Sequence, residues 1–229
     1  MIKDPPLLTI RRGFPRPRAK DVAAFAGVPT GHAVDAMGGR GGLDHGIKPL
    51  APPTAVMVGV AITCRAGPSD NLALFAAIDA AKPGDILVAA TDSFTATAVT
   101  GDLLLGMAHN RGIRGFVTDG LVRDLVGILA VGMPCYCRGL TPNSPDRSGP
   151  GTVGLPVVVG GVAIESGDIV IADGDGVVVV PRGRVAEVLK ALEDVRAAET
   201  ALEAKVKAGL EVPDFIRAIL ASGRVAEIG

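Results

Sequence analysis

Three charged residues in the middle of the chain have the types and the spacing of a carboxylate-rich active site. Asp102 directly follows Gly101, and twenty residues separate it from Arg123 and Asp124. We expect the stretch between them to form a helix and a short strand, which would bring both carboxylates and the guanidinium to one rim of a sheet. Open α/β sheets place their ligands there. Carboxylates clustered without cysteine or histidine favour a hard cation such as Mg²⁺ or Mn²⁺.

Each of the two aspartates also has a structural interpretation. A carboxylate at a helix start can cap the helix or complement its dipole, and the spacing alone leaves that open for Asp102 and Asp124. Their convergence favours the functional interpretation, because both fall at corresponding ends of consecutive units.

A further acidic residue, Glu199, lies in a long helix that we expect over residues 185–208. At about 100° per residue, it falls in the middle of an apolar stripe. The stripe consists of Val188, Leu192, Val195, Leu202 and Val206. A glutamate in this position must be paired, protonated or close to a metal. Glu199 is therefore either an interface residue paired with an arginine or a ligand that reaches a cation in its own or a neighbouring subunit.

The remaining motifs favour structural roles. Cys135 and Cys137 have strand spacing, and we expect their thiols to point to opposite faces, which argues against chelation. None of the three histidines has metal-ligand spacing. The glycines at 38–46 lack the Gly-Lys-Ser/Thr ending of a phosphate loop. The Asp173-Gly-Asp175-Gly segment predicts a hairpin turn rather than a calcium loop.

The composition fits an aliphatic core. Of 229 residues, 48% are hydrophobic but only 3% aromatic, which suits a buried β-branched sheet. The net charge of −1 gives no indication of a nucleic-acid or membrane partner. No apolar run reaches the roughly 18 to 20 residues of a membrane helix. Three cysteines do not suggest a disulfide framework, and the N-terminus does not resemble a secretory signal, so we expect a cytoplasmic protein.

The elements that position these residues alternate between helix and strand and then become β-rich, which predicts one α/β domain over residues 1–229. A Pro- and Arg-rich arm is expected at about 1–17. Helices are expected at 18–27, 33–37, 72–81, 95–112, within 121–132, at 185–208 and at 213–223. Strands are expected at 55–64, 85–92, 112–119, 133–139 and between 153 and 181, with long loops at 38–53 and 139–154. Gly84-Asp85 and Gly167-Asp168 each lead into an apolar strand, which predicts related turn–strand units.

Several segments together resemble a known family. They are Asp102-x₂₀-Arg123-Asp124 within GFVTDGLVRD, Gly46-Ile47-Lys48-Pro49-Leu50, and Gly167-Asp168-Ile169 with Asp173-Gly174-Asp175-Gly176-Val177. They are similar to the 4-hydroxy-4-methyl-2-oxoglutarate / 4-carboxy-4-hydroxy-2-oxoadipate aldolases. These class II pyruvate aldolases of aromatic compound catabolism are homologous to the RraA-like regulators of ribonuclease activity. The resemblance covers about residues 20–210. It implies a three-layer β/β/α swivelling-domain fold and homotrimers or homohexamers with active sites between subunits.

The resemblance also implies a metal site. Asp124 matches the direct ligand of Mg²⁺ or Mn²⁺, and Asp102 matches a carboxylate that holds metal-bound water. Glu199 matches an acidic residue contributed by the neighbouring subunit's long helix. The family position three residues after Asp124 is often acidic, and here it is Gly127.

The substrate site follows from the same resemblance. Arg123 matches the residue that binds the pyruvyl oxygen. The amides of Leu103 and Leu104, after Gly101, match those that hold the pyruvate carboxylate at a helix N-terminus. Positions near the distal part of the substrate are matched by Asn71, Arg147 and Ser148.

The implied chemistry is cleavage of a small 4-hydroxy-2-oxo acid into pyruvate and a second oxo acid. A divalent cation and an arginine stabilise the enolate charge at the C2 oxygen. The motif holds no lysine for a Schiff base. No histidine is placed as the base, so a metal-organised water is the candidate. Oxaloacetate decarboxylation passes through the same enolate and is an expected side activity. The alternative is an RraA-type protein that regulates ribonuclease activity by binding. It ranks second because members of that branch tend to lack part of the acidic set, whereas this chain keeps Asp102, Arg123, Asp124 and Glu199.

Overall fold

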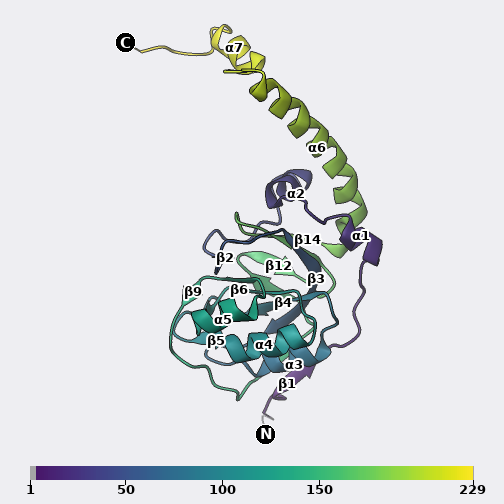
Figure 1. The fold of residues 1–229 in the computed structure, drawn as a ribbon, viewed down its shortest axis with the longest axis vertical. Coiled ribbons are helices and arrows are strands. Elements are labelled where there is room, and N and C mark those ends of the chain that lie inside the picture. The colour runs from purple at the N-terminus through teal and green to yellow at the C-terminus, as the bar shows by residue number, and fades with distance from the viewer. Residues whose placement is uncertain (1–3, 229) are drawn as a thin grey trace.

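A nine-stranded mixed sheet forms the centre of the molecule, which a computed structural model describes over residues 4–228 (Figure 1). Its strands follow the order β1 (Leu8–Ile10), β10 (Gly151–Val153), β3 (Met57–Arg65), β4 (Asp85–Ala90), β6 (Gly115–Thr118), β8 (Cys135–Cys137) and β2 (Lys48–Pro49). A hairpin of β13 (Ile169–Ala172) and β14 (Val177–Val180) also pairs with β3. Strands β3, β4, β6 and β8 run parallel, so their carboxyl ends meet at one edge.

The central strands are apolar on both faces because both faces are covered. Helices α3 (Leu72–Ala80), α4 (Asp102–Asn110) and α5 (Leu125–Val131) lie side by side on one face (Figure 1). Strands β11 (Val157–Val159) and β12 (Val162–Ile164) pack with the β13–β14 hairpin on the other face. Side chains alternate accordingly: Leu87 and Ala89 contact the helices, and Ile86 and Val88 the second β-layer. The expected β/β/α arrangement is confirmed.

A third apolar cluster joins the outer face of the β13–β14 hairpin to α1 (Ala19–Ala23), α2 (Thr30–Ala36) and the start of α6 (Val185–Lys207). The short helix η1 (Arg182–Arg184) leads into α6. In α6, Val185, Val188 and Leu192 are buried, whereas Leu202 and Val206 are 47% and 55% exposed. The helix extends away from the body towards α7 (Asp214–Leu220) (Figure 1). The predicted apolar stripe is therefore core in its first half and surface in its second.

A small parallel sheet of β5 (Ala98–Thr100), β7 (Leu121–Val122) and β9 (Gly139–Leu140) stands apart from the main sheet. It corrects the expected helix at 95–112, because residues 98–100 form β5 and the helix begins only at Asp102. The β-branched Val99 and Thr100 favour a strand, and Gly101 is extended before α4 begins at Asp102. Strands β9 and β10 likewise lie inside the expected loop at 139–154.

The expectation for the two neighbouring cysteines is wrong. Residues two apart in a strand share a face. Cys135 and Cys137 both pack towards the helices, and Tyr136 packs on the opposite side. The neighbouring Cys137 thiol, together with burial, raises the pKa of Cys135. All three cysteines of the chain are free and buried.

The two Gly-Asp units are related, as predicted. Gly84 and Gly167 adopt φ values of +89° and +104°, which favour glycine. Asp85 and Asp168 each accept a hydrogen bond from the backbone N–H three residues earlier, at 2.9 and 2.8 Å. The strands that follow, β4 and β13, flank β3 on its two sides.

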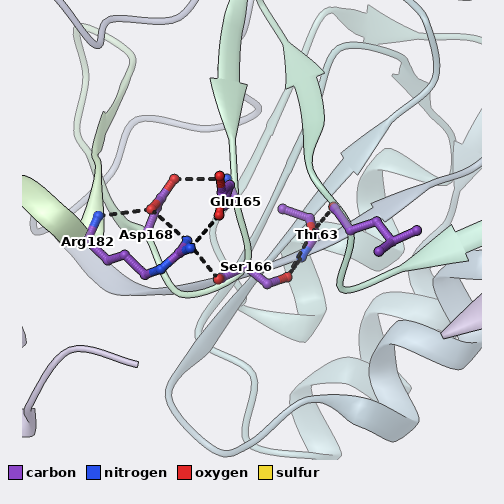
Figure 2. A network of polar contacts seen from close by, with 6 residues as sticks. Thr63, Glu165, Ser166, Asp168 and Arg182 are labelled. Carbon is purple, nitrogen blue, oxygen red and sulfur yellow. Dashed lines mark hydrogen bonds and ion pairs between the residues drawn. The ribbon is translucent and has the colours of Figure 1, made fainter. Parts of the chain in front are cut away.

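A polar network closes the second of these units (Figure 2). Asp168 accepts a hydrogen bond from the Arg182 backbone N–H at 2.9 Å, and the Arg182 guanidinium pairs with both Asp168 and Glu165. The Ser166 hydroxyl accepts a hydrogen bond from the Thr63 N–H at 2.9 Å. The network thereby ties the start of β13 to β3 and to η1. Among residues 4–228, no helix is both long and apolar enough to cross a membrane.

Candidate functional site

Two adjacent strand–helix units bring the predicted charged residues together. Gly101 lies between β5 and α4, while Arg123 and Asp124 lie between β7 and α5. Strands β5 and β7 are parallel neighbours, and the Arg123 N–H extends their pairing by donating to the Thr100 carbonyl at 3.0 Å. The starts of α4 and α5 are therefore side by side. The structure places Asp102 on the first and Asp124 on the second.

The carboxylate of Asp124 does not cap its helix. Asp124 occupies the N-cap position of α5 but makes no side-chain capping hydrogen bond. Its Oδ2 lies 3.2 Å from the Arg123 Nε, and its side chain is 42% exposed. Asp102 is different, because its Oδ1 accepts the N–H of Leu103 at 2.7 Å. The structural interpretation therefore fits Asp102 in part but does not fit Asp124.

Backbone strain collects in turns that follow strands. The described part of the chain has four non-glycine residues with positive φ, between 56° and 61°: Ser69, Asp92, Ser93 and Asp124. The first follows β3, the next two follow β4, and the last follows β7. Such conformations cost about 1–3 kcal/mol each and persist where the surroundings enforce them, commonly at functional sites.

Asp119 is a buried organiser that sequence reasoning missed. It is 2% exposed and accepts hydrogen bonds from the N–H groups of Thr91 and Ser93 at 2.7 and 2.9 Å. It thereby joins the carboxyl end of β4 to that of β6 and supports the strained turn at Asp92. Its sequence signal, an aspartate before glycine after an apolar strand, also fits an ordinary turn.

Arg123 is held from two sides. Its Nε contacts the Asp124 carboxylate, and its Nη1 donates a hydrogen bond to the Ser144 hydroxyl. Ser144 lies in the irregular loop 141–149, where no periodicity marks individual residues. Sequence reasoning therefore missed it. The side chain of Arg123 keeps 35% of its surface exposed, so its remaining donors can reach a ligand.

The loop 141–149 carries two of the three predicted distal residues, Arg147 and Ser148, and contacts the third, Asn71. Its Asp146 carbonyl accepts the N–H of Asn71 at 3.0 Å. The Asp70 carboxylate accepts the N–H groups of Ser148 and Gly149 and that of Leu72, which starts α3. One loop therefore connects Arg123, through Ser144, with the start of α3.

The distal residues differ in exposure. Asn71 is 6% exposed, and its Oδ1 is buried without a hydrogen-bond partner among residues 4–228. Arg147 and Ser148 are exposed. The Arg147 guanidinium carbon lies 5.7 Å from the centre of the Phe75 ring, within the range of a cation–π contact.

The first turn of α4 provides a place for an anion. The early N–H groups of a helix have no intrahelical partners. The Leu103 N–H donates to the Asp102 carboxylate, so an anion could bind it only by displacing Asp102. Leu104 is buried and Leu103 is 77% exposed.

Glu199 is not brought to this site within one chain. It is exposed on the projecting half of α6, which packs at its other end against α2 and η1 (Figure 1). Among residues 4–228, no three His, Cys, Asp or Glu side chains are grouped so that they could hold a metal ion. Asp102 and Asp124 are the oxygen donors that a hard cation prefers.

The two helices that begin at Asp102 and just after Asp124 carry exposed apolar residues. They include Leu103, Met107, Val126 and Leu129, all at least 48% exposed. The projecting α6 and α7 carry a second such set, with Leu202, Val206, Phe215, Ile219 and Leu220. Contiguous exposed apolar residues commonly mark protein interfaces.

Comparison with known proteins gives consistent results. A family model described as RraA-like, Aldolase/RraA, matches residues 30–179. Over 182 residues, the chain is 38% identical to a Halalkalibacterium halodurans protein provisionally named 4-hydroxy-4-methyl-2-oxoglutarate aldolase, covering 80% of this chain and 86% of that protein.

Two solved structures share the fold. Streptomyces coelicolor RraAS2, described as an unusual member of the RNase ES inhibitor RraA protein family, is 28% identical with a TM-score of 0.72. The match covers 83% of this chain and 100% of that one. An uncharacterised Pseudomonas syringae protein is 27% identical, also with a TM-score of 0.72, over 86% of this chain and 96% of that one.

Proposed function

Because this chain belongs to the RraA-like Aldolase/RraA family, we propose that it is a divalent-metal-dependent class II pyruvate aldolase. Its substrates are 4-hydroxy-4-methyl-2-oxoglutarate or 4-carboxy-4-hydroxy-2-oxoadipate, and oxaloacetate decarboxylation is a side activity. The observation that carries the proposal is Asp124, held in a strained conformation beside Arg123 without capping its helix. A carboxylate that only stabilised α5 would use the N–H groups in front of it.

Arg123 is the residue that acts on the reacting oxygen. Its guanidinium donates to the C2 oxygen, and Asp124 and Ser144 fix its direction beforehand. The N–H groups of Leu103 and Leu104 hold the substrate carboxylate at the start of α4. The C3–C4 bond then breaks, its electrons form the pyruvate enolate, and C4 becomes the carbonyl of the second product.

Asp102 supplies the position of the base. Its carboxylate holds the water that removes the proton from the C4 hydroxyl, and the enolate takes up a proton at C3 to give pyruvate. A divalent cation, when held by Asp102, Asp124 and Glu199, would supply Lewis-acid stabilisation of the developing charge. Arg147, Ser148 and Asn71 contact the distal part of the substrate.

The site is completed by a second subunit. Glu199 projects from the body of its own chain, and the apolar residues beside it need a partner. The exposed apolar surface of α4 and α5 lies beside Asp102 and Asp124 and fits that role. We therefore assign a homotrimer or homohexamer in which α6 of one subunit reaches the carboxylates of the next.

A pyruvate-release assay tests the activity. Oxaloacetate and the two 4-hydroxy-2-oxo acids are supplied with Mg²⁺, with Mn²⁺ and with EDTA. Metal-dependent pyruvate formation is expected and EDTA should abolish it. Turnover that is unaffected by EDTA, or no turnover of any of the three substrates, would contradict the proposal.

A subunit-mixing experiment tests the shared site. Asp124→Ala and Glu199→Ala should each be inactive alone. Co-expressed, they should regain up to about a quarter of the wild-type sites, because each restored site takes its intact residues from different chains. A mixture as inactive as its components would place both residues in one subunit.

The alternative is a ribonuclease regulator that acts by binding. The fold shared with Streptomyces coelicolor RraAS2 favours it, because that protein is described as an RNase ES inhibitor family member. Capture of a purified ribonuclease by a chain that shows no metal binding in calorimetry would favour this alternative over the aldolase.

A further inference from the structure

The short helix α7 carries an apolar face that residues 4–228 of its own chain leave uncovered. It has no buried residue, and Phe215, Ile219 and Leu220 are 64%, 47% and 57% exposed. Phe215 and Ile219 are four residues apart and share one side of the helix, while Arg217 lies on the other. Because α7 stands away from the body of the molecule (Figure 1), this apolar face is available to a second chain.

An apolar groove of about 530 Å³ lies on the body, at the end of α5. Its walls come from residues 49–57, from the last turn of α5 and from the start of β8. Arg114 is the one charged residue in this lining within the part of the chain that the structure describes. A cavity of about 150 Å³ holds a benzene ring, so the groove has room for the apolar side chains of α7.

Exposed apolar residues along α5 connect the groove with the carboxylate site. Leu125, Val126 and Leu129 are 37%, 82% and 48% exposed, and Leu129 also lines the groove. Their spacing of three and four residues places them along one side of the helix. The helix covers about 12 Å between Asp124 at its start and Gly132 at its end, at 1.5 Å per residue.

The C-terminal region has the length to follow this apolar track. Under the proposed function, Glu199 lies beside Asp124 of the partner subunit. From Glu199, α6 continues for about 12 Å to its last residue, Lys207, and α7 then begins at Asp214. An α6 that runs along α5 of the partner subunit therefore brings α7 to the groove at the far end of that helix.

Charge favours the same occupant. Glu211 and Asp214 are exposed at the start of α7. The Arg114 guanidinium at the groove donates one hydrogen bond, from Nη1 to the Val58 carbonyl at 2.9 Å. A guanidinium has five N–H donors, so others remain for a carboxylate.

We propose that α7 of one subunit docks in the groove at the end of α5 of the next, with Phe215 and Ile219 in the groove and Asp214 beside Arg114. This inference rests on the proposed function for the course of α6. The position of α7 can be measured without activity.

The test cross-links two co-expressed full-length variants, Leu129→Cys and Phe215→Cys, with a short bismaleimide. This reagent joins neighbouring thiols without requiring disulfide geometry. A covalent dimer with one chain of each kind is expected, because the native cysteines are buried. The matched control replaces Leu129→Cys by Val158→Cys, at a 58% exposed position of β11 outside the groove, and should give no dimer with Phe215→Cys.

A charge exchange tests the orientation of α7. Asp214→Arg in the Phe215→Cys chain should lower the yield of dimer about 5-fold, as loss of an exposed ion pair can do, and Arg114→Glu in the Leu129→Cys chain should restore it. A yield that neither change alters would contradict the pairing of Asp214 with Arg114.

Three results would overturn the docking. They are cross-linking of Phe215→Cys with itself, equal yields with Val158→Cys and Leu129→Cys, and no cross-link in oligomers that light scattering shows to be intact. Cross-linked protein that turns over none of the three proposed substrates would keep the docking and reject the aldolase. Active protein that does not cross-link would reject the docking alone.

Discussion

Two clusters in this molecule combine an arginine with carboxylates, and they use them differently. In the network around Asp168, both carboxylate oxygens accept backbone N–H groups, and the residue is 4% exposed. In the cluster around Asp124, the carboxylate has the neighbouring guanidinium as its partner and is 42% exposed. Residue types alone do not distinguish the two. A carboxylate saturated by backbone donors is structural, whereas one left partly open in a strained backbone is available for a ligand.

The largest expected effect separates the clusters by activity. Arg123→Ala and Asp124→Ala should each lower turnover at least about 100-fold, as removal of transition-state charge stabilisation does. Thermal unfolding should change little, because both side chains are partly exposed. Steady-state kinetics with oxaloacetate measures the turnover, and calorimetric unfolding measures the thermal stability. Wild-type-like turnover in either variant would show that this cluster is also structural.

The converse change should act on stability. Asp168→Asn leaves backbone donors in the buried turn without a carboxylate acceptor and weakens the pairing with Arg182. The free energy of unfolding should therefore fall by about 2 kcal/mol. For a chain of this size, that corresponds to a fall in the melting temperature of about 4–8 °C. The KM and turnover of the remaining folded protein should equal those of the wild type. A large loss of turnover at unchanged stability would remove the contrast between the clusters.

A smaller effect should follow from Ser144→Ala. This change removes one of the two contacts that direct Arg123, so turnover should fall about 10-fold with little change in stability. Ser144→Thr serves as the control, because it keeps a hydroxyl that can accept the hydrogen bond from Arg123. Equal activity of Ser144→Ala and the wild type would show that Asp124 alone orients the guanidinium.

The smallest effect concerns a third carboxylate, that of Asp173. Burial would raise its pKa, but hydrogen bonds from Thr30, Asp175 and Gly176 outweigh this and hold the pKa below the ordinary 3.8. Its stabilisation is thus present above pH 3.8 and is lost as pH falls through the lower folded-state pKa. Because the residue is only partly buried, solvent screening limits the effect to about 1 kcal/mol. In urea unfolding, the unfolding free energies of the wild type and Asp173→Asn should differ at pH 7 and become equal in acid. A difference that stays constant with pH would contradict this.

The sequence predicted the main architecture because burial patterns are strong in this chain. The apolar runs of β3, β4 and β6 and the periodic helix α6 are at or near their expected positions. The sequence predicts a helix where β5 (Ala98–Thr100) lies, because a three-residue strand is too short to be recognised beside a long helical pattern. The predicted orientation of Cys135 and Cys137 is wrong, because only consecutive strand residues point to opposite faces and residues two apart share one.

The charged candidates were found for a similar reason. Gly-Asp and Arg-Asp at strand ends are local signals, and the structure brings them together at neighbouring helix starts. Asp119 and Ser144 were not found, because their roles depend on tertiary hydrogen bonds to residues more than twenty positions away.

The loop 141–149 has an evolutionary consequence. It directs Arg123 through Ser144 and carries Arg147 and Ser148 next to the start of α3. Under the proposed function, a change that adapts its far end to a new substrate will therefore also disturb the arginine at its near end. Substrate selectivity and turnover would then be inherited together, and a loop transplanted from a relative should transfer both traits or neither.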